Sequence, residues 1–278
     1  MKIIVTGAKG TLSKKVSDHL RKNHLVKQIS LRGNVEEVDI EEHTDCVVHI
    51  AGVTPSNITS EDDYELVNVQ KTAALYKTCQ ARGVKHFIYI SSMSVYEGYF
   101  KRLFHKGIGK STPCSPKTPY ARSKHRAEQT IIKEYDGRMS YTIIRVPSLY
   151  DSLKKEYFSS FVTFASRMPI VFMSPFKIKK SLLHTDNLCA LIQRHVEKAI
   201  LCNEIVLPQD GKIANVNMLL SKIVAENGIK KRKSYLAGLL LFFVSLVLPR
   251  FRGLFQSVYY VEKDSELCLD VSLDDVKI

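Results

Sequence analysis

Near its N-terminus the chain reads Val5-Thr6-Gly7-Ala8-Lys9-Gly10-Thr11-Leu12-Ser13. A short apolar run over residues 2–6 enters this glycine loop, and a helix is expected to begin near Thr11. In such a unit the first glycine permits a tight turn, the second lets backbone approach a phosphate, and the helix N-terminus offers free N–H groups to the anion. Ser13 replaces the usual third glycine and should slightly loosen the packing of helix on strand. The loop predicts a pyrophosphate site formed by Gly7, Lys9, Gly10, Thr11 and Leu12.

Strand-like and helical segments alternate through the first 150 residues. Strands are expected over residues 25–31, 46–50, 87–90 and 141–146, and residues 87–90 form a near-continuous apolar run of the kind buried in a parallel sheet. A helical pattern covers residues 63–82, and a second helix should run from Thr118 (N-cap) and Pro119 (first turn) to about residue 135. This alternation predicts the α/β class with a doubly wound parallel sheet.

The domain organisation follows from where the alternation stops. Residues 1–150 are expected to form a dinucleotide-binding domain, with the helical pattern within 181–200 packing back on it. Residues 151–180 and 201–278 are more irregular, and we expect them to form a small substrate-binding lobe.

Composition limits the compartment and the metal chemistry. The chain has 278 residues, 45% hydrophobic and 25% charged, which suits a packed globular protein. Its six cysteines include no C-x-x-C pair, and Cys46 and Cys189 lie within apolar runs, so we expect buried thiols in a reducing compartment. The nine histidines show no ligand spacing, and no metal site is expected. The N-terminus lacks the pattern of a signal peptide, so we expect a cytoplasmic protein.

The formal net charge of +13 calls for an anionic partner, and nucleic acid, a lipid surface or a phosphorylated substrate would each fit. A basic run, 230–233, precedes an apolar run, 235–248, and Arg250 and Arg252 follow it. The apolar run is shorter than the roughly 20 residues of a spanning helix. Two interpretations stay open for residues 230–252. We favour a lobe helix covered by the sheet domain or by a second subunit in a homodimer; the alternative is peripheral contact with an anionic inner membrane face.

A tyrosine followed four positions later by a lysine occurs three times, as Tyr120/Lys124, Tyr150/Lys154 and Tyr259/Lys263. The first pair alone lies near the start of a well-marked helix, where residues i and i+4 share a face. It alone also follows a core strand that ends in Ser91-Ser92-Met93-Ser94-Val95-Tyr96. A nearby ammonium lowers the pKa of a phenol from roughly 10, and a serine hydroxyl can bind a substrate oxygen. The first pair is therefore the expected proton-transfer site.

Taken together and in this order, the motifs resemble those of the extended short-chain dehydrogenase/reductases, the family of nucleotide-sugar epimerases, dehydratases and reductases. The matching segments are Thr6-Gly7-x-x-Gly10, His49-Ile50-Ala51-Gly52, Asn68-Val69, Ser91 to Tyr96, Tyr120-x-x-x-Lys124, Arg145-Val146-Pro147-Ser148-Leu149-Tyr150 and Leu183-His184-Thr185-Asp186-Asn187-Leu188. The resemblance implies a Rossmann fold, a nicotinamide cofactor and a UDP-sugar substrate.

Carried over position by position, the resemblance makes Ser92, ahead of Ser91, the hydroxyl donor, Tyr120 the proton-transfer residue and Lys124 the residue that tunes it. It implies further cofactor contacts at Ala51, Gly52, Tyr120, Lys124, Pro147 and Ser148. It implies substrate contacts at Ser92, Met93, Ser94, Tyr120 and Lys180, the last standing where many relatives bind the diphosphate with an arginine. Asn68, His49 and His184 are expected to be structural.

The end of the second strand bears on the form of the cofactor. An NAD site usually places an acid there to bind the ribose hydroxyls, but Gln28-Ile29-Ser30-Leu31-Arg32 contains none. Ser30 and Arg32 could instead bind a 2′-phosphate. We expect NADP(H) rather than NAD(H); the alternative is that Arg32 is a solvated turn residue.

The resemblance leaves three reactions to choose from. A dehydratase of the family would carry Asp-Glu where Met93 and Ser94 stand, which disfavours dehydration. The second strand favours a net reductase, which consumes NADPH, over a UDP-sugar 4-epimerase that retains bound NAD. The pattern is most similar to 4-ketoreductases that finish UDP-linked 6-deoxy-hexosamines for capsules and O-antigens. We therefore expect an NAD(P)H-dependent reductase of a UDP-4-keto-6-deoxy sugar for cell-surface polysaccharide synthesis.

Two alternatives lie outside the enzymes. A nucleic-acid-binding protein would explain the charge, but the chain has no tryptophan, no RNA-binding aromatic signature and no zinc finger, so no nucleic-acid partner is expected. A non-catalytic NADPH sensor would not need the serine, tyrosine and lysine set. Two departures from the family pattern leave the sugar open: Glu97 stands where glycine often follows Val-Tyr, and Tyr150-Asp151-Ser152 replaces Tyr-Gly-Pro.

Overall fold

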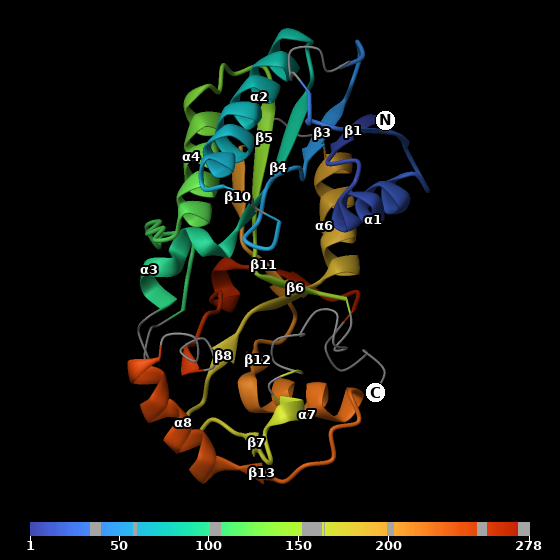
Figure 1. Cartoon of the computed structure of the whole chain (residues 1–278). Coiled ribbons are helices and arrows are strands. Elements are labelled where there is room, and N and C mark those ends of the chain that lie inside the picture. Colours follow the sequence, from blue (N-terminus) through green and yellow to red (C-terminus); the bar gives the residue numbers. More distant parts are fainter. Residues whose placement is uncertain are drawn as a thin grey trace. The chain divides into compact units, whose positions relative to one another are not determined.

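The computed structural model describes residues 1–33, 40–57, 60–100, 107–151, 163, 165–198, 203–248 and 255–271. The chain divides into two units (Figure 1). The first comprises Met1–Glu97, Pro113–Val146 and Leu188–Pro208, and the second comprises Gly98–Thr112, Pro147–Asn187 and Gln209–Ile278. Residues 98–112, 147–150 and 181–187, which were expected with the first domain, fall in the second unit, and residues 201–208, expected in the lobe, fall in the first.

The first unit is built on a parallel six-stranded sheet in the order β10-β5-β4-β3-β1-β2. The strands are β1 (Lys2–Thr6), β2 (Leu25–Ile29), β3 (Cys46–His49), β4 (His86–Ser92), β5 (Ser140–Val146) and β10 (Glu204–Val206). All four residues of β3 are buried, as expected for a strand covered on both faces. The predicted doubly wound parallel sheet is confirmed, and β10 adds an edge strand that the sequence pattern did not indicate.

Helices flank this sheet on both faces. They are α1 (Thr11–Leu20), α2 (Lys71–Ala81), α4 (Pro119–Lys133) and α6 (Thr185–Lys198), the last belonging to the first unit from Leu188 onward. Figure 1 shows α2 and α4 on one face and α1 and α6 on the other. Beneath α2 and α4, Leu75, Tyr76 and Ile131 pack in one apolar core with Phe87 and Tyr89 of the sheet. The alternation of strands and helices along the sequence therefore corresponds to a unit of three layers, with the sheet between two layers of helices.

The start of α4 is as predicted. The side chain of Thr118 accepts the N–H of Ala121 at 3.2 Å, and Pro119 occupies the first turn. This cap matters for the site because Tyr120 is the next residue along the helix.

The helical pattern predicted over 63–82 is split in two. Residues Tyr64–Gln70 form a π-helical segment, η2, and α2 begins only at Lys71. Within η2, Asn68 accepts the N–H of Val53 at 2.8 Å and donates to the carbonyl of Val53 and to Ser123, both at 3.0 Å. Asn68 therefore ties the loop after β3 to α4, which confirms the structural role expected for it.

The second unit has short strand pairs in place of a large sheet among its described residues. The pairs are β6 (Ser148–Tyr150) with β9 (Leu182–His184), β7 (Val171–Phe172) with β13 (Lys233–Ser234), β8 (Lys179–Lys180) with β12 (Ala214–Asn215), and β11 (Pro208–Asp210) with β14 (Glu266–Cys268). Two helices accompany them, α7 (Val216–Glu226) and α8 (Tyr235–Val247). The remaining short elements are η3 (Met93–Tyr96), α3 (Glu97–Phe100) and η5 (Glu262–Asp264). In the described part of the chain, every helix is too short or too polar to cross a bilayer.

Candidate active site

The loop after β1 has the backbone that the sequence predicted. Gly7 has φ +90°, a conformation that L-residues with a side chain rarely adopt. The N–H of Gly10 donates to the Gly7 carbonyl at 2.8 Å. Ser13 is buried and donates its hydroxyl to the carbonyls of Gly7 and Gly10. The hydroxyl of Ser13 thus fastens the loop to the first turn of α1, while the looser packing of helix on strand expected for this residue stays a prediction.

The N-terminus of α1 is suited to an anion. Its N-cap, Gly10, makes no side-chain cap, and the first turn carries no acidic residue. The strand order also reverses at β1, which pairs with β2 on one side and β3 on the other, and such switch points are where ligands enter doubly wound sheets. A Cβ added to Gly7 would lie 3.4 Å from the backbone of Ala51, so the loops after β1 and β3 adjoin. These features fit a dinucleotide pyrophosphate.

The loop after β2 presents Ser30 and Arg32 to solvent. The N–H of Arg32 donates to the Ser30 hydroxyl at 3.3 Å. Lys71, at the start of α2, donates its ammonium to the carbonyls of Leu31 at 2.6 Å and Gly33 at 3.1 Å. Lys71 was not anticipated from the sequence, where it reads as a solvated helix residue. It fastens the segment that the sequence assigned to the 2′-phosphate.

Ser92, Tyr120 and Lys124 come together in the first unit, from the carboxyl end of β4 and the first turns of α4. Ser92 accepts the N–H of Ser94 at 3.1 Å, and its hydroxyl lies near enough to the phenol of Tyr120 to lower the pKa of that phenol. Lys124 is only 5% exposed and donates to the carbonyl of Ile90 at 2.9 Å. The three residues therefore form a set within the described structure. Their catalytic role stays a prediction.

Burial dominates the ionisation of this set. Burial raises the pKa of Tyr120, and the neighbouring hydroxyl of Ser92 acts in the opposite direction. Burial lowers the pKa of Lys124 to about 8, while the carboxylate of Glu128 opposes this change. The ammonium points to the Ile90 carbonyl, and the group that lowers the pKa of Tyr120 in this structure is Ser92 rather than Lys124.

Behind the set lies a buried ion pair that the sequence did not single out. Glu128, one turn after Lys124 on α4, pairs with Arg145 of β5 at 2.6 Å, and both side chains are nearly inaccessible to solvent. Ser91 donates its hydroxyl to Glu128, and Arg145 also binds the hydroxyl of Tyr96. Ser91 is thus committed to the core, which favours Ser92 as the substrate-facing hydroxyl. An arginine within the apolar run of β5 was the signal available in the sequence.

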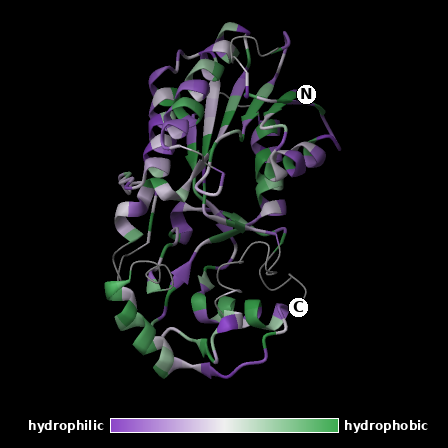
Figure 2. Ribbon diagram, in the orientation of Figure 1, coloured by the Kyte–Doolittle hydropathy of each residue, from purple (hydrophilic) through white to green (hydrophobic). Residues whose placement is uncertain are grey.

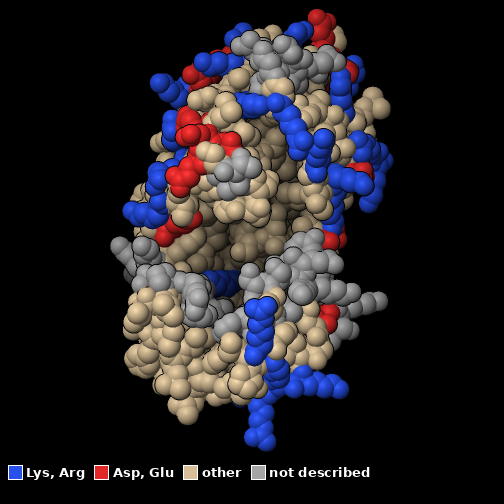
Figure 3. Space-filling view, viewed as in Figure 1, with Lys and Arg blue, Asp and Glu red and all other residues tan. Residues whose placement is uncertain are grey.

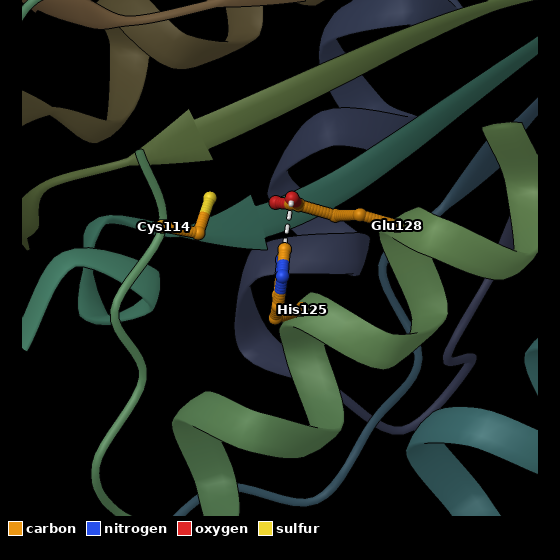
Figure 4. Close-up of side chains that lie close together, drawn as sticks. All are labelled: Cys114, His125 and Glu128. Atoms are coloured by element: carbon orange, nitrogen blue, oxygen red, sulfur yellow. Dashed lines mark ion pairs between the residues drawn. The ribbon is translucent and has the colours of Figure 1, made fainter. Parts of the chain in front are cut away.

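Figure 4 shows Cys114 and His125 directed toward the carboxylate of Glu128. His125 Nδ1 lies 3.7 Å from that carboxylate, and burial raises the pKa of the Cys114 thiol. The three side chains lie close enough to share a metal ion. However, Glu128 already binds Arg145 and Ser91, and the adjacent guanidinium would repel a cation. We therefore assign this cluster to the core.

A pocket of about 410 Å³ opens beside Tyr120 in the first unit. Tyr64 forms part of its wall, with its ring centroid 5.8 Å from that of Tyr120. Glu97, also in the wall, accepts the N–H of Thr118 at 2.8 Å and that of Lys117 at 3.2 Å. Glu97 thus fixes the start of α4. The sequence had marked it only as a departure from the family pattern.

The remaining predicted contacts are distributed over both units. In the first, Met93 is buried, and the buried Ser94 hydroxyl has no hydrogen-bond partner among the described residues. In the second, Pro147 is buried, Ser148 is exposed, and burial lowers the pKa of Lys180 to about 8. The contributions of these residues to a site stay predictions.

The other two tyrosine–lysine pairs have different surroundings. Tyr150 is buried and donates its hydroxyl to Asp210 at 2.7 Å, while Lys154 lies outside the described residues. The Tyr259 ring lies 5.1 Å from the Lys179 ammonium. His49 hydrogen-bonds Thr6 and Thr72, and burial lowers its pKa to about 3. A neutral, packed histidine is the structural role expected for His49.

Solved structures share this architecture. A short-chain dehydrogenase/reductase superfamily protein from Agrobacterium tumefaciens with bound NAD superposes with TM-score 0.74 at 18% identity, covering 99% of this chain and 94% of that one. The dTDP-4-dehydrorhamnose reductase of Bacillus anthracis in complex with NADP gives 0.66 at 18% identity, covering 84% of each chain. At this identity the likeness establishes the fold. Fold and motifs define an extended short-chain dehydrogenase/reductase.

The sequence identifies the family more closely. Residues 1–180 match the family model described as RmlD substrate binding domain, and the chain belongs to this family. It is similar to UDP-glucose 4-epimerase of Vibrio cholerae, with 30% identity over 158 residues, or 53% of this chain and 45% of that protein. It is also similar to dTDP-D-glucose 4,6-dehydratase of Mus musculus, with 32% identity over 124 residues, or 44% of this chain and 31% of that protein. The chain thus spans less than half the length of these curated relatives.

Proposed function

We propose that this chain is an NAD(P)H-dependent reductase of a nucleotide-linked 4-keto-6-deoxy sugar, of the UDP-hexosamine type used for cell-surface polysaccharides. The observation that carries the proposal is that the hydroxyl of Ser92 lies beside Tyr120, which lines a pocket, with Lys124 one turn further along α4. A non-catalytic sensor of NADPH would have no use for this arrangement.

In the proposed mechanism, a bound reduced nicotinamide would supply the hydride that C4 of the sugar accepts. Ser92 orients the C4 carbonyl oxygen by donating its hydroxyl to it, and Tyr120 protonates that oxygen as negative charge develops. Because burial raises the pKa of Tyr120, the phenol stays protonated at neutral pH, which is the form that a reduction requires. The proposal gives Lys124 the role of stabilising the phenolate left after proton transfer, which requires its ammonium to leave the Ile90 carbonyl that it binds in this structure. Tyr120 regains its proton from solvent.

The residues present suit a phosphorylated dinucleotide. The glycine loop and the uncapped N-terminus of α1 would hold the pyrophosphate. The exposed Ser30 and Arg32 would bind a 2′-phosphate, with no carboxylate among residues 28–32 to repel it. Similar solved structures contain NAD or NADP, so NAD(H) is the alternative to NADP(H).

The relatives support a nucleotide-sugar substrate, since those named above act on UDP- or dTDP-linked sugars. Lys180 of β8 would bind the diphosphate as a point charge. Free, mostly buried cysteines among the described residues are in keeping with a cytoplasmic protein. The second candidate is a UDP-sugar 4-epimerase, favoured by the Vibrio cholerae relative.

The test is to incubate the protein with NADPH or NADH and a panel of UDP-4-keto-6-deoxy sugars. A reductase consumes one reduced nicotinamide for each C4 alcohol formed, and the proposal expects faster consumption of NADPH. An epimerase would interconvert C4 epimers of UDP-sugars without net consumption. Absence of any turnover over the panel would contradict the proposal.

A further inference from the structure

Helix α8 of the second unit carries a row of large apolar side chains on its solvent side. Leu236, Leu240, Phe243 and Val247 follow the spacing i, i+4, i+7, i+11, which places them on one face. They are 71%, 61%, 56% and 77% exposed. Figure 2 shows the helix as largely hydrophobic, and Figure 3 shows no Lys, Arg, Asp or Glu over it. We call these four residues the outer stripe.

The opposite face fixes the helix to its own unit. Ala237, Gly238, Leu241 and Ser245 are buried. A Cβ added to Gly238 would lie 1.8 Å from the carbonyl oxygen of Met173, so the helix approaches that backbone as closely as glycine allows. The inner face of α8 is therefore packed closely against its own unit. Among the residues that the structure describes, the side chains of the outer stripe stay mostly exposed.

An outer helix face is normally polar, so the outer stripe calls for an apolar environment. The helix has 13 residues, which at 1.5 Å per residue is about 20 Å, short of the roughly 30 Å hydrocarbon core. It can therefore lie in a membrane interface and cannot cross the membrane.

The charge next to the helix identifies the kind of surface. Lys230, Arg232 and Lys233 immediately precede α8 and are exposed, and Figure 3 shows Lys and Arg side chains projecting from the segment that leads into the helix. Lys231 instead donates to the carbonyls of Ser166 and Met168 and anchors that segment to the unit. We name the three exposed side chains the basic collar. Basic side chains beside an interfacial apolar helix favour anionic lipid headgroups.

We propose that the outer stripe and the basic collar bind the chain to the surface of an anionic lipid bilayer, with α8 lying in the plane of the headgroups. A second copy of the chain fits less well, because pairing two outer stripes supplies no anionic partner for the basic collars. The net charge of +13 further favours an anionic surface. This attachment goes beyond the proposed reaction and does not depend on it.

The experiment uses the full chain in flotation assays with phosphatidylcholine vesicles containing or lacking phosphatidylglycerol. We expect flotation with the anionic vesicles and weak flotation with phosphatidylcholine alone. Leu236→Glu combined with Phe243→Glu should weaken flotation at least about tenfold, because charge on the stripe opposes its burial in lipid. Replacing Lys230, Arg232 and Lys233 by glutamine should weaken binding to anionic vesicles about fivefold for each charge removed at low salt.

The matched control is Leu25→Glu, since Leu25 of β2 is as exposed as Leu236, at 71%, and lies in the first unit. This variant should float like the unmodified chain. Circular dichroism of every variant keeps a folding defect separate from a binding defect. Equal flotation of the stripe variant and the unmodified chain would overturn the proposal. So would a dimer in analytical ultracentrifugation that the stripe variant dissociates, because the stripe would then be a subunit interface.

Discussion

Lys124 is buried with its ammonium on the Ile90 carbonyl, and the Glu128 carboxylate opposes the loss of its proton. Glu128 is itself held by Arg145 and Ser91, and Ser91 precedes Ser92 in β4. The buried carboxylate of Glu128 therefore acts on the ionisation of Lys124 and also hydrogen-bonds β4, the strand that carries Ser92. We regard Glu128 as a positioning residue for the proposed site.

Glu128→Gln should alter the pH dependence of the reaction. Removing the carboxylate takes away the group that raises the pKa of Lys124, so that pKa falls further below about 8. Because the proposed mechanism needs the ammonium, the alkaline decline of kcat should move to lower pH. Leaving Arg145 without its partner should also destabilise the protein by about 3–5 kcal/mol.

The measurement is a kcat profile over pH on protein shown to be folded by circular dichroism. Glu134→Gln is the control, because Glu134 lies just after α4 and pairs with Lys77 at the surface. That change should leave the profile in place. An unchanged alkaline limb in folded Glu128→Gln protein would refute the coupling to Lys124.

Arg32→Ala tests the form of the cofactor. If Arg32 binds a 2′-phosphate, its removal should raise KM for NADPH about 10–100-fold, the worth of a charge-assisted hydrogen bond, and leave KM for NADH unchanged. Steady-state kinetics with both cofactors measure this, with Arg21→Ala as control because Arg21 is exposed and pairs with Asp18. Equal effects on both cofactors would assign Arg32 to the solvated turn.

At the scale of the elements, the start of α4 sets the position of Tyr120. Thr118 caps the helix, and Glu97 holds Thr118 from the other side. Thr118→Ala should lower stability by about 1 kcal/mol and should lower kcat more than it raises KM, because it loosens the turn that carries Tyr120.

Ser234→Ala is the matched control, since Ser234 caps α8 in the same way by accepting the N–H of Ala237 at 3.1 Å. Thermal unfolding and kinetics of both variants should show similar losses of stability, with a fall in kcat for Thr118→Ala alone. Equal kcat for the two variants would show that the cap does not position Tyr120.

The elements were predictable where local chemistry marks their ends. Thr118 and Pro119 marked α4, and the glycine loop marked the junction of β1 and α1. The strand β10 was missed because Glu204–Val206 is too short to show a periodicity. The π-helical segment η2 was missed because a 3.6-residue apolar pattern does not distinguish a π-helix from an α-helix.

The motif residues of the candidate site could be predicted from the sequence, whereas the residues that hold them in place could not. Ser92, Tyr120 and Lys124 stood out by spacing and context. Glu128 did not, and Arg145 appeared only as part of a family segment, because the pairing of these two charged residues depends on how α4 packs on β5. Lys71 was hidden for the same reason, since its carbonyl partners on the loop after β2 are distant in sequence.

At the scale of the whole molecule, a cofactor that binds only the native state must raise its stability. NADPH at a hundred times its Kd should add about 2.7 kcal/mol, which would raise Tm by several degrees. Differential scanning fluorimetry with NADPH and NADH measures this. A larger shift with NADPH supports the 2′-phosphate site, and no shift with either dinucleotide would contradict a nicotinamide-binding fold.

The account depends most directly on the hydroxyl of Tyr120. The deciding measurement is the NADPH oxidation rate of the Tyr120→Phe variant with the sugar found in the substrate panel, beside Tyr259→Phe as a control from another tyrosine–lysine pair. We predict that Tyr120→Phe binds NADPH normally and loses about 10²–10⁴ in kcat, while Tyr259→Phe keeps its rate. Full turnover by Tyr120→Phe would contradict the proposed mechanism.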